Sequence, residues 1–158
     1  MATPYDRLRE LGIELPAAPP PAANYVPTQT VSIGEGQALV YVAGQIPRQP
    51  DGSFYSGRIP TEVSIEAGKA AARSCGIAIL AQLEAAGGLD RVERILQVIG
   101  FVNCEAGFGE QPEVVNGCSD LLVEVLGEAG RHTRAAVGAN ALPRNVTVEI
   151  AAVAVLRT

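Results

Sequence analysis

The stretch RHTRAAVGANALPRNVTVEIAAVAVLRT, residues 131–158, decides the fold. It predicts two strands, 133–141 and 146–156, which the turn residues Pro143 to Asn145 join as a closing hairpin. The second strand is apolar at nearly every position, as in strands that are covered on both faces. Glu149 is the exception. Burying a lone carboxylate costs on the order of several kcal/mol, so Glu149 needs either a structural partner or a chemical task.

The chain before this hairpin predicts three more strands and two helices. The expected strands are 25–33, 38–44 and 94–104, and the expected helices are 61–86, with Thr61 as N-cap, and a second that opens at Pro112 and ends by Gly130. This ββαβαββ order is typical of an α+β fold with two helices on one face of a sheet. Several strands are nevertheless apolar on both faces, so the uncovered face must meet another layer. A symmetric oligomer is the simplest source of that layer.

The length of 158 residues predicts a single domain, residues 25–158, preceded by an N-terminal arm, residues 1–24. The arm combines a short helix with the Pro-rich linker PAAPPPAA at 16–23. Two interpretations of the arm stay open. It lies across the domain or a neighbouring subunit, or it is a loose terminus.

Charge and cysteine content argue against several classes of protein. Twelve basic against 17 acidic residues give a net charge of −5, which argues against a nucleic-acid partner. No apolar run approaches the ~20 residues of a membrane span, and the N-terminus lacks a signal-peptide core, so a cytoplasmic protein is expected. Cys75, Cys104 and Cys118 follow no metal spacing and the chain has one histidine. We therefore expect free, mostly buried thiols and no metal site.

Four features follow one another along the chain: VAGQIP at 42–47, VIGFV at 98–102, Asn116 in the second helix and TRAAVGANALPRNVTVEIAAVAV at 133–155. Taken in this order, they resemble the reactive-intermediate deaminase family (Rid or YjgF-type, also called endoribonuclease L-PSP-like). The resemblance covers residues 25–158 and is most specific in the closing segment. It implies a chorismate-mutase-like fold and a homotrimer whose sheets face inward, with clefts between subunits. That assembly would supply the missing layer.

The resemblance also implies an activity that needs no metal or cofactor. Deaminases of this type hydrolyse 2-imino and enamine acids to 2-oxo acids and ammonia. Carried over by position, Arg134 matches the arginine that holds the substrate carboxylate, and Glu149 matches the glutamate near the attacking water. Three further positions match residues of the cleft: Tyr25, Gly44 and Asn116.

Two positions depart from the family pattern. Ala136 stands where the deaminases often carry a cysteine, and Ala43 stands where they often carry a serine. Both changes remove polar groups from the cleft. They favour the alternative that the chain is a trimeric binding protein for a small carboxylate metabolite, without turnover. A ribonuclease activity fits poorly with the acidic charge and with the single histidine.

Each candidate residue also has a purely structural interpretation. Arg134 could form an interface salt bridge, and Glu149 could be the buried partner of an arginine or of backbone amides. Tyr25 could cap the sheet edge, and Asn116 could contact solvent or backbone. His132, at a strand start, is expected to be solvated.

The predicted hairpin also restricts the geometry of the site. With a two-residue turn at 143–144, Arg134 would lie about 13 Å along the strand from the position opposite Glu149, at ~3.3 Å per residue. The two side chains could not touch, so a ligand, a water or a neighbouring subunit would have to bridge them.

Overall fold

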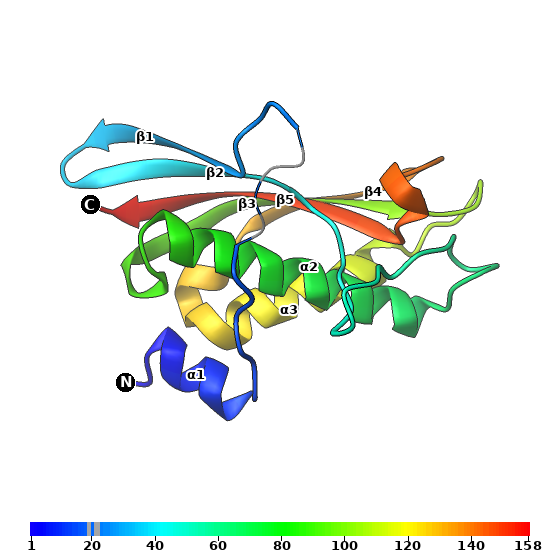
Figure 1. Ribbon diagram of the computed structural model, residues 1–158, viewed down its shortest axis with the longest axis horizontal. Helices are drawn as coiled ribbons and strands as arrows, with labels where there is room; N and C mark the ends of the chain where they lie inside the picture. The colour runs from blue at the N-terminus through cyan, green and yellow to red at the C-terminus, as the bar shows by residue number, and fades with distance from the viewer. Residues whose placement is uncertain (19, 21–22) are drawn as a thin grey trace.

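The computed structural model describes residues 1–18, 20 and 23–158 (Figure 1). The strands are β1 (Thr28–Gly34), β2 (Gln37–Gln45), β3 (Val92–Asn103), β4 (Thr133–Ala139) and β5 (Val148–Arg157). The helices are α1 (Pro4–Glu10), α2 (Ile65–Ala86) and α3 (Gln111–Leu126), and short 3-10 turns follow α2, α3 and β4. The predicted order of strands and main helices is confirmed. The linker positions 19, 21 and 22 lie outside the described residues.

The five strands form one sheet in the order β1-β2-β5-β3-β4. The predicted closing hairpin is therefore wrong, because β5 pairs with β2 and β3, whereas β4 pairs in parallel with β3 at the sheet edge. The two-sided apolar character of β5 suits this central position. The fully buried Asn103 holds the crossing chain, since its Nδ2 donates to Oδ1 of Asn145 at 3.0 Å and to the carbonyl of Val146 at 3.1 Å.

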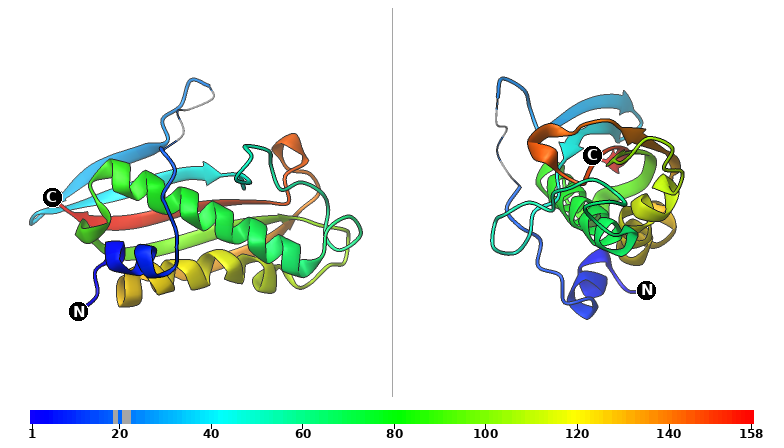
Figure 2. Two further views of the ribbon diagram at one scale, coloured as in Figure 1. Left: turned by 60° about the horizontal axis from the view of Figure 1, so that its bottom comes forward. Right: turned by 90° about the vertical axis from the view of Figure 1, so that its right-hand side faces the viewer.

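Helices α2 and α3 cover one face of the sheet, and Figures 1 and 2 show both on the same side. The N-cap of α2 is Ser64, whose side chain accepts from the amide of Ala67, so the predicted start at Thr61 is wrong. Thr61 instead donates its hydroxyl to Glu105 at 2.8 Å. Between the helices and the sheet lies the core, whose fully buried members include Val40, Cys75, Ile79, Leu83, Val98, Leu121, Leu122 and Ile150.

The other face of the sheet carries apolar side chains that no helix covers. Along β2 the residues alternate, with Val40 and Val42 buried towards the helices and Tyr41 51% exposed. This open face also carries exposed side chains from the other strands, namely Val31, Ile33, Phe101 and Val137. A lone protomer thus leaves a broad apolar surface in water, as the two-sided apolar strands predicted.

The N-terminal arm packs against its own domain. Thr3 and Asp6 form a capping box at the start of α1, and Leu8 is only 6% exposed. Nη1 of Arg7 donates to the carbonyl of Val125 in α3. The chain then passes across α2 before it reaches β1 (Figure 2). Tyr25 precedes β1, which begins at Thr28 rather than at the predicted residue 25.

No helix in the described part of the chain is long and apolar enough to cross a membrane.

Candidate functional site

The five predicted site residues form two groups at different parts of the sheet. Glu149 and Gly44 lie together on β5 and β2, near Tyr25 at the entry to β1. Arg134 and Asn116 contact each other across β4 and α3. Each group has its own surroundings and its own chemistry.

Glu149 projects from the open face of the sheet. On β3 its neighbour is Phe101, which in turn pairs with Val137 of β4, so the three share one face. The side chain is half-buried, and burial raises the pKa of its carboxyl above the usual value. Among the described residues no group donates a hydrogen bond to this carboxylate or forms an ion pair with it. No structural partner for Glu149 is therefore found in the described part of this chain.

Gly44 makes room for the Glu149 carboxylate. It lies in an irregularity where β2 passes β5, between Val42 and Gln45. A Cβ at this position would overlap Oε1 of Glu149 and lie 3.0 Å from its Cδ. Only glycine therefore leaves the carboxylate where it stands. Tyr25 is 51% exposed and lies outside the sheet, so it does not cap the edge through strand pairing.

Arg134 points to the opposite side of the sheet. It pairs with Val98, which is fully buried beneath the helices, so the guanidinium lies beside α3. Nη1 donates to Oδ1 of Asn116 at 2.8 Å and to Oγ of Ser119 at 3.1 Å. Among the described residues no carboxylate pairs with this half-buried guanidinium. Its positive charge is thus positioned by neutral oxygens and not neutralised.

His132 and Ser119 support this arginine. Nδ1 of His132 lies 2.6 Å from the carbonyl of Gly130, which can only accept, so Nδ1 carries the proton. The neutral ring then accepts at Nε2 from the Ser119 hydroxyl at 2.9 Å. Burial, with a smaller contribution from the charge of Arg134, lowers the pKa of His132. The expectation of a solvated histidine is therefore wrong.

Ser119 did not emerge from the sequence as a candidate. The signal that could have found it is its spacing, because residues three apart on a helix lie on the same face. Asn116 and Ser119 have that spacing on α3 and both reach Arg134.

The two groups cannot form a single site within one protomer. Glu149 shares the open face with Phe101, whereas Arg134 shares the helix-covered side with Val98. One strand also separates them laterally, since β3 lies between β5 and β4. The sequence predicted that Arg134 and Glu149 would be separated along a hairpin. In the structure they are instead separated by the sheet, because they project from its opposite faces.

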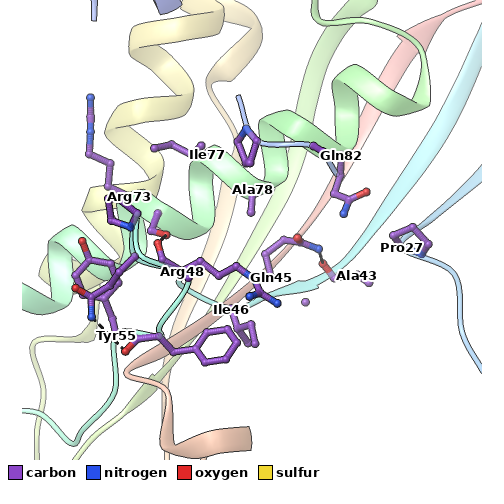
Figure 3. A pocket seen from close by; sticks show the side chains of 18 of the residues that line it. Pro27, Ala43, Gln45, Ile46, Arg48, Tyr55, Arg73, Ile77, Ala78 and Gln82 are labelled. Carbon is purple, nitrogen blue, oxygen red and sulfur yellow. Dashed lines mark hydrogen bonds between the residues drawn. The ribbon is translucent and has the colours of Figure 1, made fainter. Parts of the chain in front are cut away.

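A cavity of about 720 Å³ adjoins the first group (Figure 3). Tyr25, Ala43 and Gly44 contribute to one side of it, next to the part of β2 that extends beyond the start of β1. The N-terminal arm, α2 and the loop 46–55 supply the other walls.

The cysteines and acidic residues offer no metal centre in the described part of the chain. No three His, Cys, Asp or Glu side chains gather there in a metal-binding cluster. Cys75, Cys104 and Cys118 are free and buried, as predicted. Burial raises the pKa of Cys118 to about 12, so this thiol remains protonated and inert at neutral pH.

These features define a class of protein: a small α+β domain in which Arg134 on one side of the sheet and Glu149 on the other have no oppositely charged partner among the described residues. Residues 5–156 match the family described as "YjgF/chorismate_mutase-like, putative endoribonuclease", and the chain belongs to this family.

Individual relatives resemble the chain over nearly its whole length. Protein TCP17 of Trypanosoma cruzi is 43% identical over 145 residues, which cover 90% of this chain and 88% of that protein. The solved structure of the protein Atu1372 of Agrobacterium tumefaciens is 41% identical with a TM-score of 0.84, covering 98% of this chain and 94% of that one. A structure from Shewanella oneidensis MR-1 is 34% identical with a TM-score of 0.86, covering 97% and 99%.

Proposed function

We propose that the chain forms a homotrimer with inward-facing sheets and binds a small carboxylate metabolite where Arg134 of one copy meets Glu149 of the next. There it hydrolyses 2-imino or enamine acids to 2-oxo acids and ammonia, without metal or cofactor. The observation that carries the proposal is the state of Arg134. It is half-buried, held by Asn116 and Ser119, and has no carboxylate partner among the described residues. Such a guanidinium is suited to bind a substrate carboxylate.

The trimer is supported by the open face of the sheet. Exposed apolar side chains from four strands gather there, and a second layer would remove them from water. Burial of an Ile, Val or Phe side chain stabilises an assembly by about 1.5–3 kcal/mol, so a shared face of this kind would hold strongly.

Glu149 is suited to activate water against an imine carbon. As water attacks, a C–O bond forms at the imine carbon, and one water proton passes to the Glu149 carboxylate and from there to nitrogen, which gives a carbinolamine. The hydroxyl proton of the carbinolamine then passes by the same carboxylate to nitrogen, the C–N bond breaks as C=O forms, and ammonia and a 2-oxo acid are released. A carboxylate whose pKa is raised by burial is a stronger base than an ordinary carboxylate. Because the imine is already electrophilic, orientation of one water supplies much of the remaining rate.

A relative supports an amino-acid-like ligand. The structure of Escherichia coli TdcF holds bound serine and resembles this chain at 25% identity with a TM-score of 0.61. Serine carries the carboxylate that we assign to Arg134 here. The comparison supports the class of ligand, while the reaction rests on the arrangement of Arg134 and Glu149.

A second candidate function is binding without turnover. Ala43 and Ala136 favour it, because both stand where the deaminases often carry a polar side chain. In that case Arg134 would still bind the carboxylate, and Glu149 would only orient the ligand.

A subunit-mixing experiment tests the shared site. Ammonia release is measured with freshly generated 2-imino acids for Arg134→Ala, for Glu149→Ala, and for the two variants unfolded together and refolded. Each variant alone should be inactive. Random mixing at equal amounts leaves each interface a one-in-four chance of combining both intact residues, so about a quarter of the wild-type activity should return.

Two results would contradict the proposal. Mixed oligomers without recovered activity would show that the site is not shared between copies. No ammonia release by the wild type above the buffer rate, with several imino acids, would leave only the binding function. Calorimetry with 2-oxo acids then decides that function, because Arg134→Ala should abolish binding and Glu149→Ala should retain it.

A further inference from the structure

We propose that the cavity beneath the N-terminal arm, which we call the arm cavity, binds a second ligand: an elongated organic monoanion with an apolar body and a hydrogen-bonding group at its far end. The arm cavity lies between arm residues 14–17, α2 and the loop 46–55. Its volume of about 720 Å³ falls in the range of sites that enclose small organic molecules. This inference does not depend on the proposed reaction.

The walls of the arm cavity favour an apolar body. Apolar side chains and ring carbons come from the arm, from the loop and from α2, namely Pro16, Ala17, Ile46, Tyr55, Ile77 and Ala78. Figure 3 shows Ile77 and Ala78 projecting from α2 beside the cavity. A ligand that covers these surfaces gains the hydrophobic free energy of each area that it removes from water.

Two arginines at one end favour an anion. The guanidinium carbons of Arg48 and Arg144 lie 4.8 and 5.7 Å from the ring centroid of Phe54, so both cations contact the same aromatic ring. Neither arginine pairs with a carboxylate among the described residues. Both arginines also line the arm cavity, so an anion that enters it would be attracted by two positive charges.

The other charged residues that line the arm cavity indicate the net charge that we expect of the ligand. The third arginine, Arg73, is neutralised by Glu124 at 2.9 Å. Glu14 of the arm is the one carboxylate in the lining. Two free guanidiniums against one carboxylate leave a single uncompensated positive charge, which a monoanion neutralises.

The backbone around Arg144 is held in an uncommon conformation. Arg144 and Asn145 have φ values of 57° and 55°, although neither is glycine. Such residues cost on the order of 1–3 kcal/mol each and persist only where the surroundings hold them. Here Asn103 binds the Asn145 side chain, and the amide of Gly57 donates to the Asn145 carbonyl at 2.9 Å. The structure thus maintains a strained turn that places Arg144 in the lining of the arm cavity.

Gln82 is the residue that we expect to contact the far end of the ligand. Its side chain lines the arm cavity, is only 2% exposed, and extends from α2 towards the side of Ala43 and Pro27 (Figure 3). An amide both donates and accepts hydrogen bonds, so a hydroxyl or carbonyl that enters the cavity would bind here.

The helix sets the approximate length of the ligand. Ser74 holds the loop by donating to the carbonyl of Arg48 at 2.7 Å. Ser74 and Gln82 lie eight positions apart along α2, about 12 Å at 1.5 Å per residue. A phenyl ring with a short carboxylate chain on one side and a hydroxyl on the other spans most of this distance.

The probe that we choose is 3-(3-fluoro-4-hydroxyphenyl)propionate, titrated into the full-length protein and followed by its ¹⁹F resonance. We expect saturable binding that persists in Arg134→Gln. Arg144→Gln should weaken binding about tenfold, as loss of a charge-assisted hydrogen bond does. Arg94→Gln, an exposed arginine outside the cavity lining, is the matched control and should leave binding unchanged.

Two further variants separate ligand binding from a structural effect. Glu14→Gln should tighten binding, because it removes the carboxylate that opposes the anion. Ala78→Phe should fill the cavity and abolish binding without changing any charge. Replacement of the probe by its uncharged amide should weaken binding in the wild type but matter little in Arg144→Gln.

The inference is overturned if the probe does not saturate the wild type below about 10 mM, a weak affinity of roughly −3 kcal/mol. Loss of binding in Arg134→Gln would also overturn it, because the probe would then occupy the proposed catalytic cleft. If Arg144→Gln and Glu14→Gln both bind the probe as tightly as the wild type does, the ligand of the arm cavity is not recognised by a negative charge. Failure of the imino acid assay would leave these expectations intact.

Discussion

Replacement of Gly44 by alanine tests whether the position of the Glu149 carboxylate matters, rather than only its presence. A Cβ at residue 44 would overlap Oε1 of Glu149 and come within 3.1 Å of its Cγ and Cδ. The side chain must therefore move, and a displacement of about 1 Å at a reacting group costs on the order of 100-fold in rate. That loss corresponds to about 2.7 kcal/mol of transition-state stabilisation.

The stability of the Gly44→Ala protein should change little. Glu149 has no hydrogen-bond partner among the described residues, so its carboxylate can swing away without breaking a contact. We expect kcat for ammonia release to fall about 100-fold, with KM and Tm close to those of the wild type. Substitution of both residues, Gly44→Ala with Glu149→Ala, should lower kcat no further than Glu149→Ala alone.

Gly109→Ala is the matched control. Gly109 is exposed, and a Cβ built on it meets no atom within 4 Å. Its activity should equal that of the wild type. If Gly44→Ala keeps full activity, or if it lowers kcat equally when Glu149 is absent, the role assigned to the Glu149 carboxylate is wrong.

Three further predictions concern the open face, the pH dependence and the support of Arg134. Phe101→Asp should convert the proposed trimer to monomers in light scattering, whereas Leu11→Asp, equally exposed but on the arm, should not. If both variants remain trimeric, the open face is not the surface that joins the copies. Burial raises the pKa of Glu149, so its ionisation costs stability as the pH rises above about 4.5 through the raised pKa. Glu149→Gln should therefore raise Tm relative to the wild type at pH 8 and lose that advantage towards pH 4. The kcat of the wild type should fall as the pH drops through the same pKa. A Tm difference that stays constant with pH would contradict the raised pKa of Glu149. Ser119→Ala removes one of two hydrogen bonds to Arg134 and should raise KM about three- to tenfold with little change in kcat, and a fall in kcat alone would contradict a positioning role.

The kind and order of the elements could be predicted from the sequence, because buried residues of helices and strands recur with a characteristic apolar periodicity. The two-sided apolar pattern of β5 even indicated that the helices could not be its only cover. The pairing of the last two strands was predicted wrongly. Turn residues at Pro143 to Asn145 show that the chain reverses direction, but not which strand lies next to which. The insertion of β5 beside β2 depends on contacts between segments far apart in sequence, such as Asn103 with Asn145.

Parts of the candidate site were visible in the sequence and parts were not. Gly44 was identified by resemblance, and its contact with Glu149 follows from the pairing of β2 with β5. The arm cavity could not be predicted, because Glu14, Gln82 and Arg144 show no pattern along the chain. The support of Arg134 by His132 through Ser119 was missed because α3 reaches β4 only in three dimensions.

The positions of Arg134 and Glu149 restrict how copies can associate if one ligand is to contact both. The two residues project from opposite faces of the same sheet, so the surface that offers Glu149 differs from the surface that offers Arg134. A contact between two different surfaces is heterologous, and repeated heterologous contacts either close into a ring or grow into a filament. A ring in which the apolar open faces turn inward satisfies both requirements at once, because it covers those faces and places each arginine beside the next glutamate. Any assembly that covers the open face but keeps Arg134 and Glu149 of different copies apart would therefore exclude the shared site, whatever its size.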